Sequence, residues 1–141
     1  MSLREASRTL ERPESHENAI SKEIVDAIYK IHSKLGPGLL ESVYEVILAH
    51  ELKKRGLRVQ RQLPISIAWE EVRFEEGYRL DLMVEEKVLV EVKSVQGIEP
   101  VHKKQLLTYL RLMDKRLGIL VNFNQELIRD GIKRVVNGLE E

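Results

Sequence analysis

The chain has 141 residues, a length that fits one domain with a substantial core. Its hydrophobic content of 43% and charged content of 33% are those of an ordinary globular protein. The absence of cysteine excludes disulfides and thiolate metal sites, and it favours a cytoplasmic location. No apolar run is long enough to span a bilayer, so we expect no membrane partner.

A formal net charge of zero means that the chain lacks the overall basic character typical of many nucleic-acid-binding proteins. The charge is nevertheless unevenly distributed. Residues 58–100 carry six basic and nine acidic side chains, and residues 101–141 carry eight basic and five acidic ones. The basic C-terminal third could contact phosphates, although charged surfaces are usually just solvated.

The first 55 residues are predicted to form a tail and two helices. Residues 1–15 are polar without periodicity, and we expect a flexible tail ahead of a single domain over 16–141. Apolar residues at helical spacing predict a helix from about 17 to 35, with Ser15 or Asn18 as its N-terminal cap.

A second helix is predicted over about 39–55, after the breaker Gly36-Pro37-Gly38. Glu41 lies in its first turn, where a carboxylate is also favourable simply because it is near a helix N-terminus. The apolar stripe of this helix is predicted to bury Leu40, Val43, Tyr44, Ile47, Leu48 and Leu52.

Residues 58–94 are predicted to form strands. Residues 58–68 alternate between apolar and polar, and Pro64 favours an edge position or an irregularity. Residues 69–74 are predicted to be a short partner strand. The segment 79–94 then reads as two strands joined by the turn Glu85-Glu86-Lys87. Its apolar positions are predicted to line one core-facing side, namely Leu80, Leu82 and Val84 on the first strand and Val88, Val90 and Val92 on the second.

The register of this hairpin fixes where its charges lie. A three-residue turn sets Val84 opposite Val88 and Asp81 opposite Glu91, with Lys93 two residues along on the same face. Like charges directly opposite each other destabilise a ladder, whereas Mg²⁺ prefers carboxylate oxygens. Two interpretations stay open at this point: a metal site, and a solvated face on which Lys93 neutralises one acid.

The remaining chain is predicted to form a helix over 100–113, a buried strand over 117–123 and a short helical C-terminus. Gln105 and Tyr109 are one turn apart on one helix face. His102 could join that face, although a lone histidine here is more often a surface or capping residue. The apolar positions of the C-terminal helix are predicted to be Leu127, Ile128, Ile132, Val135 and Val136. This order of elements predicts an α/β fold, a central mixed sheet with helices on both faces.

Four motifs, in order along residues 17–138, resemble those of a known family. Gly38-Leu39-Leu40-Glu41-Ser42-Val43-Tyr44 is similar to the signature of the GxxExxY protein family, which is assigned to the PD-(D/E)XK nuclease superfamily. Asp81 followed by Glu91-Val92-Lys93 resembles the superfamily core, although Leu80 replaces its proline. Gln105 and Tyr109 resemble the QxxxY motif of RecB-like members, and residues 122–137 resemble the C-terminal segment of the family.

The resemblance implies a restriction-endonuclease-like core and a metal-dependent phosphodiester hydrolase acting on nucleic acid, with DNA as the expected substrate. Asp81, Glu91 and Glu41 would hold Mg²⁺, with the carbonyl of Val92 as a further ligand, and Mn²⁺ is expected to substitute. Lys93 would orient the attacking water or stabilise charge on the phosphorus-centred transition state. On the predicted helix over 100–113, Gln105 and Tyr109 would support Lys93 or contact the substrate.

Two other hypotheses remain beside a nuclease. One is a nucleic-acid-binding or regulatory module with little or no catalysis, because fold does not imply function. The other is a structural protein in which Glu41, Asp81, Glu91 and Lys93 form a buried ion network. A homodimer would let a small single-domain nuclease cut both strands, but no pattern in the sequence identifies its interface.

Overall fold

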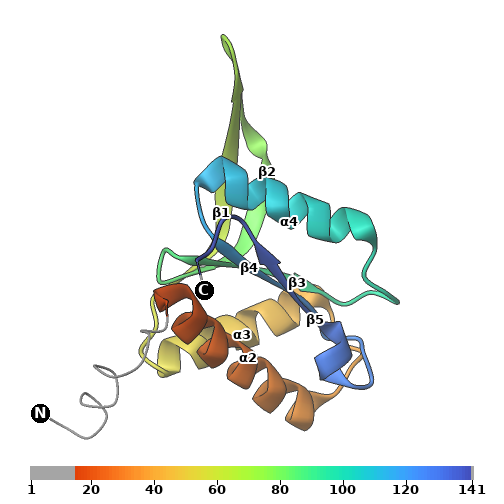
Figure 1. Ribbon diagram of the computed structural model, residues 1–141. Coiled ribbons are helices and arrows are strands. Elements are labelled where there is room, and N and C mark those ends of the chain that lie inside the picture. Colours follow the sequence, from red (N-terminus) through yellow and green to blue (C-terminus); the bar gives the residue numbers. More distant parts are fainter. Residues whose placement is uncertain (1–14, 141) are drawn as a thin grey trace, which may run out of the picture.

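The computed structural model describes residues 15–140 of the chain. A five-stranded sheet separates two helical layers, with α2 and α3 on one face and α4 on the other (Figure 1). The predicted flexible tail covers residues 1–15; residues 1–14 lie outside the described residues, and Ser15 is the N-terminal cap of α2. The elements, in chain order, are α2 (His16–Leu35), α3 (Glu41–Lys54), β1 (Val59–Trp69), β2 (Val72–Val84), β3 (Val88–Lys93), α4 (Pro100–Met113), β4 (Leu117–Asn122), the 3₁₀ helix η1 (Ile128–Gly131) and β5 (Ile132–Val136).

The strands follow the chain order β1-β2-β3-β4-β5 across the sheet. The pair β3–β4 is parallel and its crossover is α4, whereas the other pairs are antiparallel. A parallel pair needs a crossover of this kind because its strands start at the same edge. The predicted α/β class, a mixed sheet with helices on both faces, is confirmed.

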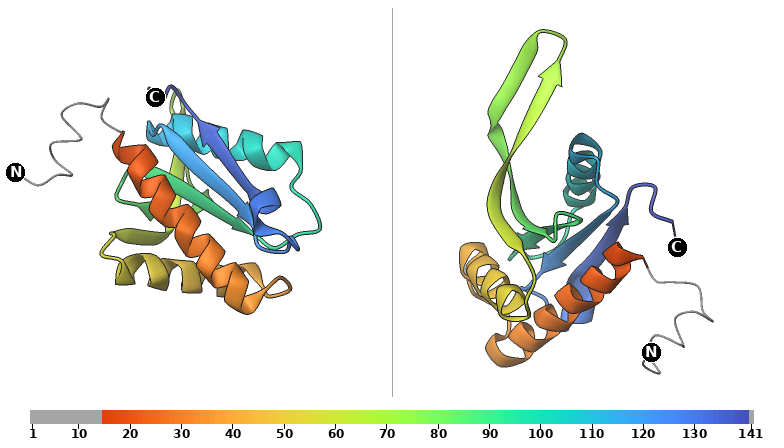
Figure 2. Two further views of the ribbon diagram at one scale, coloured as in Figure 1. Left: turned by 60° about the horizontal axis from the view of Figure 1, so that its bottom comes forward. Right: turned by 90° about the vertical axis from the view of Figure 1, so that its left-hand side faces the viewer.

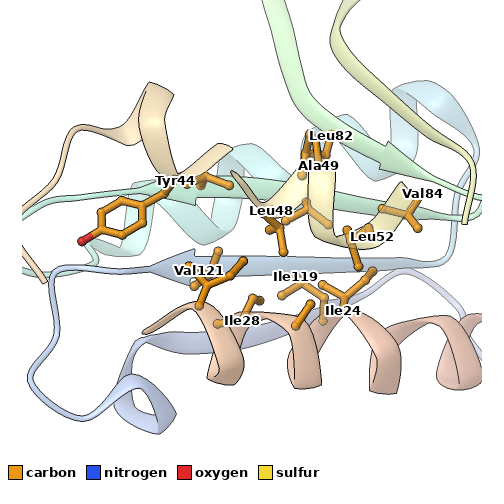
Figure 3. Close-up of a cluster of buried hydrophobic side chains, with 14 of the residues drawn as sticks. Ile24, Ile28, Tyr44, Leu48, Ala49, Leu52, Leu82, Val84, Ile119 and Val121 are labelled. Atoms are coloured by element: carbon orange, nitrogen blue, oxygen red, sulfur yellow. The ribbon is translucent and has the colours of Figure 1, made fainter. Parts of the chain in front are cut away.

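The first core cluster lies between the sheet and helices α2 and α3, as Figure 3 shows. Of the two predicted caps of α2, Ser15 is the one found: its Oγ accepts a hydrogen bond from the backbone N–H of Asn18 at 3.1 Å. The strands contribute every second residue to this layer, as the pleat requires. Members labelled in the figure include Ile24, Ile28, Leu48, Leu52, Leu82, Val84, Ile119 and Val121.

The second core cluster lies under α4, where Leu106 and Leu110 pack on Met83, Leu89 and Leu120. Gly118 permits this close approach, because a Cβ at that position would lie 2.9 Å from the side chain of Leu106. The two clusters together bury both faces of β3 and β4, which explains the apolar run in β4 and at the start of β3, before Glu91.

Helix α3 buries a different stripe from the predicted one. Leu40 is 72% exposed and Val43 is also exposed, so their predicted burial is wrong. Glu45 is instead buried, and the stripe continues through Ala49. The apolar residues of this helix lie nearly all round it, so their spacing alone did not decide which face packs on the sheet.

Strands β1 and β2 form one long hairpin with a two-residue turn at Glu70-Glu71. The predicted short strand over 69–74 is therefore the start of β2, which continues to Val84. The hairpin curves away from the sheet and projects beyond α4 (Figure 2).

Leu80 contradicts the simple alternation predicted for β2. It belongs to the second core cluster with Met83, whereas Leu82 belongs to the first. The β1–β2 register passes from Arg61↔Leu82 to Leu63↔Leu80 and skips Gln62, whose φ of 52° is left-handed. The register is nevertheless the same on both sides of Gln62, so the change of face lies at Asp81 of β2 itself, and the register shift of the hairpin lies farther out, between Ile65 and Ile67.

The predicted helical C-terminus is wrong. Only Ile128–Gly131 is helical, as one 3₁₀ turn, and Ile132–Val136 is the strand β5, paired antiparallel with β4. A short apolar run does not distinguish a helix from an edge strand, and here pairing with the buried strand β4 decides the outcome.

Candidate active site

The candidate site is built on the hairpin β2–β3. The ladder pairs Val84 with Val88 and Leu82 with Val90, which confirms the predicted three-residue turn. Both Glu85 and Glu86 take φ of 54° in this turn. The carboxylate of Glu85 is held by Arg58, whose Nε donates to Glu85 Oε2 at 2.9 Å.

Beyond Leu82 the side chains of Asp81 and Glu91 take the place of ladder hydrogen bonds. The backbone N–H of Val92 donates to Asp81 Oδ2 at 2.8 Å, and the backbone N–H of Asp81 donates to Glu91 Oε1 at 3.0 Å. The two carboxylates therefore lie together, as the register argument predicts. Each also satisfies a backbone donor of the opposite strand, so both have a structural use in addition to any catalytic one.

Lys93 is the cation nearest to this pair. Its Nζ lies 3.8 Å from Glu91 Oε2, and Glu91 is only 5% exposed. The lysine thus lies beside the carboxylates, on the same side of the hairpin, as predicted. One ammonium group next to two largely buried carboxylates leaves negative charge for a further cation to balance.

The pKa values of the two acids reflect burial first and neighbouring negative charge second. Burial raises the pKa of Glu91 to about 7, and the neighbouring charge of Asp81 adds to the effect. Burial likewise raises the pKa of Asp81 to about 6, with a contribution from the nearby carboxylate of Glu45. Lys93 opposes both shifts without cancelling them.

Glu45 of α3 is a component of the site that sequence reasoning missed. Its carboxylate accepts from Arg61 Nη2 at 2.9 Å and from Gln62 Nε2 at 2.5 Å. The same amide nitrogen of Gln62 lies 3.4 Å from Asp81 Oδ1, so it bridges the carboxylates of Glu45 and Asp81. A signal existed for Glu45, which lies at helical spacing with the buried Leu48, Ala49 and Leu52; none existed for Gln62.

Glu41, the helical carboxylate of the sequence motif, lies at the end of β3. Its Oε1 accepts from the backbone N–H of Ser94 at 3.2 Å, directly after Lys93. Ser94 Oγ in turn donates to the carbonyl of Leu39 at 2.7 Å. These bonds join the start of α3 to the hairpin. A cavity of about 620 Å³ opens here, lined by Gly38, Leu39, Leu40, Glu41, Ser42, Ser94 and Asn124.

Helix α4 brings Tyr109 to the same site. This tyrosine is 5% exposed, and its pKa is raised to about 12, first by burial and then by the charge of Glu91. Gln105, one turn earlier, is half-buried and forms no hydrogen bond with the described residues. His102 is a capping residue, since its Nδ1 accepts from the backbone N–H of Glu99 at 2.9 Å.

The donor chemistry of Asp81 and Glu91 fits a hard divalent cation, because both offer carboxylate oxygens with excess negative charge. Within residues 15–140, however, no group of three or more acidic or histidine side chains is arranged to hold a metal. Of the three acids predicted as metal ligands, Asp81 and Glu91 lie together, while Glu41 lies at the adjacent end of β3. Metal binding by Glu41 and by the carbonyl of Val92 stays a prediction.

The sequence of the chain identifies the family to which it belongs. The sequence model of the PD-(D/E)XK nuclease superfamily matches residues 18–135. The chain belongs to this superfamily. No curated protein and no solved structure matches the chain. Among the described helices, none combines the length and apolar character needed to cross a membrane.

Proposed function

We propose that this PD-(D/E)XK protein is a metal-dependent phosphodiester hydrolase acting on nucleic acid, with DNA as its substrate. The observation that carries the proposal is the placement of two acids at one end of the hairpin. The carboxylates of Asp81 and Glu91 each accept from a backbone N–H of the opposite strand, and Lys93 Nζ lies 3.8 Å from Glu91 Oε2. A folding argument alone does not favour two largely buried like charges at neighbouring positions. Superfamily membership supplies the reaction class.

The proposed metal is Mg²⁺, with Mn²⁺ as a substitute, held by Asp81 and Glu91 and completed by Glu41 and the carbonyl of Val92. When bound, such a metal lowers the pKa of its water and offsets charge on phosphate oxygens. Lys93 is proposed to stabilise the charge that develops on the phosphate in the transition state. On α4, Gln105 and Tyr109 are proposed to contact the substrate.

The proposal is tested by a cleavage panel of single-stranded, double-stranded and branched DNA and of RNA, with Mg²⁺ or Mn²⁺. We expect cleavage of DNA by the intact chain and no detectable cleavage by Asp81→Ala or Glu91→Ala, because each variant removes a proposed ligand. Asp114→Ala is the matched control, since this aspartate is exposed at the C-terminal cap of α4. Cleavage that survives both site substitutions would contradict the proposal.

A second candidate function is a nucleic-acid-binding module that does not turn over. The bridge from Gln62 to Glu45 and Asp81 favours it, because the amide uses an Asp81 oxygen that a metal would otherwise approach. Salt-dependent DNA binding without cleavage of any substrate in the panel would support this function over the first.

The raised pKa values predict how pH affects stability and metal binding. The folded chain holds protons on Asp81 and Glu91 more tightly than the unfolded chain, with pKa values of about 6 and 7 against 3.8 and 4.5. Their contribution to stability is therefore present below about pH 4 and is lost as pH rises through 6 to 7, a loss on the order of a few kcal/mol.

A divalent cation should reverse this loss, because it favours the ionised carboxylates. We expect Mg²⁺ or Mn²⁺ to raise the melting temperature more at pH 8 than at pH 5, as measured by thermal denaturation with and without metal. Glu91→Gln serves as the comparison, since it keeps a side-chain acceptor for the backbone N–H of Asp81 while removing the charge. An equal metal effect at both pH values, or in the variant, would argue against a metal held by this pair.

A further inference from the structure

The outer part of the β1–β2 hairpin, residues 66–77, forms a two-stranded ribbon without a core of its own. Its described side chains are exposed or at most half-buried. Figure 2 shows the ribbon projecting away from the sheet and from every helix. Below it, the hairpin is anchored by Ile65, which is 2% exposed and belongs to the second core cluster.

One face of this ribbon is apolar. The register pairs Ile67 with Phe74 and Trp69 with Val72, so these four side chains share a face, while the pair Ala68 and Arg73 lies on the other. Trp69 is 75% exposed, Val72 65% and Phe74 52%. The row continues toward the body of the protein through Tyr78, whose ring centroid lies 6.2 Å from that of Phe74.

An isolated two-stranded hairpin is marginally stable in water, and a contiguous exposed apolar patch commonly marks an interaction site. The ribbon carries Trp, Phe and Val where a solvated hairpin would carry polar side chains. A partner surface must therefore match the ribbon in both apolar character and charge.

The charge of the ribbon argues against nucleic acid as its partner. Residues 66–77 contain four glutamates and one arginine, a formal net charge of −3. Glu70 and Glu71, at the turn, form no ion pair with the described residues. A phosphate backbone would be repelled by this tip, whereas a basic protein surface would be attracted to it.

Helix α4 presents such a surface. Residues 100–113 contain Lys103, Lys104 and Arg111 and no acidic residue, a formal net charge of +3. None of the three forms an ion pair within the described chain. Val101 and Leu112, which are 63% and 43% exposed, add apolar area beside Lys104 and Arg111, while Lys103 lies at the opposite border of the exposed side.

We propose that the ribbon of one copy docks on the exposed side of α4 in a second copy, forming a homodimer with two identical ribbon–helix contacts. The apolar row Ile67, Trp69, Val72 and Phe74 would cover Val101 and Leu112, and the glutamates of the turn would face the lysines of the helix. A two-fold axis makes the arrangement closed, because each chain offers one ribbon and one helix.

Trp69 makes this proposal directly measurable, because it is the single tryptophan of the chain. Sedimentation velocity of the full chain is expected to show a monomer–dimer equilibrium. Over the same concentration range, tryptophan emission should move to shorter wavelength and acrylamide quenching should fall as Trp69 becomes covered. Neither readout depends on cleavage, so failure of this proposal and failure of the proposed nuclease function are distinguishable.

Charge reversal tests which surfaces meet. Glu70→Lys/Glu71→Lys and Lys103→Glu/Lys104→Glu are each expected to weaken the dimer by roughly tenfold or more, because both contacts then bring like charges together. An equimolar mixture of the two variants should recover dimerisation, since each ribbon then faces a helix of opposite charge. Lys53→Glu/Lys54→Glu is the matched control, an adjacent pair of exposed lysines on α3.

Three results would overturn the proposal. The first is a monomer at all concentrations with Trp69 fully quenchable. The second is a dimer that persists in both charge-reversed variants. The third is protection of Trp69 only on addition of single-stranded DNA, which would make nucleic acid the occupant of the ribbon. A change in the far-ultraviolet circular dichroism of the variants would be checked first, although the reversed residues are exposed.

Discussion

Lys93→Ala is expected to lower kcat for nucleic-acid cleavage by about 100- to 1,000-fold, the usual loss when a group that stabilises transition-state charge is removed. The expected loss is large because Lys93 is the cation closest to the acid pair, 3.8 Å from Glu91 Oε2. In the proposed reaction, negative charge develops on the phosphate oxygens next to the Lys93 ammonium group. The measurement is single-turnover cleavage with saturating Mg²⁺, so that binding and chemistry are separated.

The pH profile gives this variant a second readout. Lys93 lowers the pKa of both Asp81 and Glu91, so its removal should raise them further. Metal binding to the variant should then require a higher pH than in the parent chain. Lys87→Ala is the control, because Lys87 is exposed in the turn of the same hairpin. An unchanged rate in Lys93→Ala would remove the lysine from the mechanism.

Tyr44→Ala is expected to destabilise the fold by about 3–5 kcal/mol, the typical cost of deleting a buried aromatic side chain. Tyr44 is fully buried, and its ring stacks on Phe123 with centroids 4.4 Å apart. Its hydroxyl donates to the carbonyl of Gly36 at 2.6 Å and accepts from the backbone N–H of Leu39 at 3.2 Å. Urea denaturation measures the loss as a lower midpoint at constant m-value.

Tyr44→Phe separates the ring from the hydroxyl. We expect a smaller loss, about 1–3 kcal/mol, because the partly buried backbone groups of Gly36 and Leu39 lose their partner while the stack on Phe123 remains. Those groups belong to the segment 36–40 that leads into Glu41, so the variant should also impair cleavage if Glu41 is a ligand. Tyr29→Phe is the matched control at an exposed position of α2. Equal stability of Tyr44→Phe and the parent chain would contradict a positioning role for the hydroxyl.

The hairpin shows what the sequence could predict. Turn length and the alternation of Val88, Val90 and Val92 define a register, and the register brings Asp81 to Glu91 without further information. The same alternation failed at Leu80, which packs in the second core cluster while Leu82 packs in the first. The change of face between them depends on packing against other elements, which the local pattern of one strand does not contain.

The remaining errors have the same physical origin. Leu40 and Ile132 are apolar residues whose environment is decided by elements distant in the chain. The first is exposed in the short connection before α3, and the second becomes part of an edge strand because β4 offers free backbone groups. Glu45 was recognisable as a charge on a buried stripe. Its hydrogen bond to Gln62 was not, since it depends on how β1 lies against α3.

The sheet divides where Asp81 and Glu91 replace the ladder. Between the acid pair and the turn at residues 85–87, β2 pairs with β3. On the other side of the acid pair, β3 stays paired with β4, while β2 is paired with β1 alone. The carboxylates are thus the last link between β2 and β3, and beyond them the hairpin is held to the body by Leu80 and Ile65 in the second core cluster. Related chains could lengthen, shorten or rewrite the ribbon, and so exchange their partners, while the acid pair and the helices around it stay as they are.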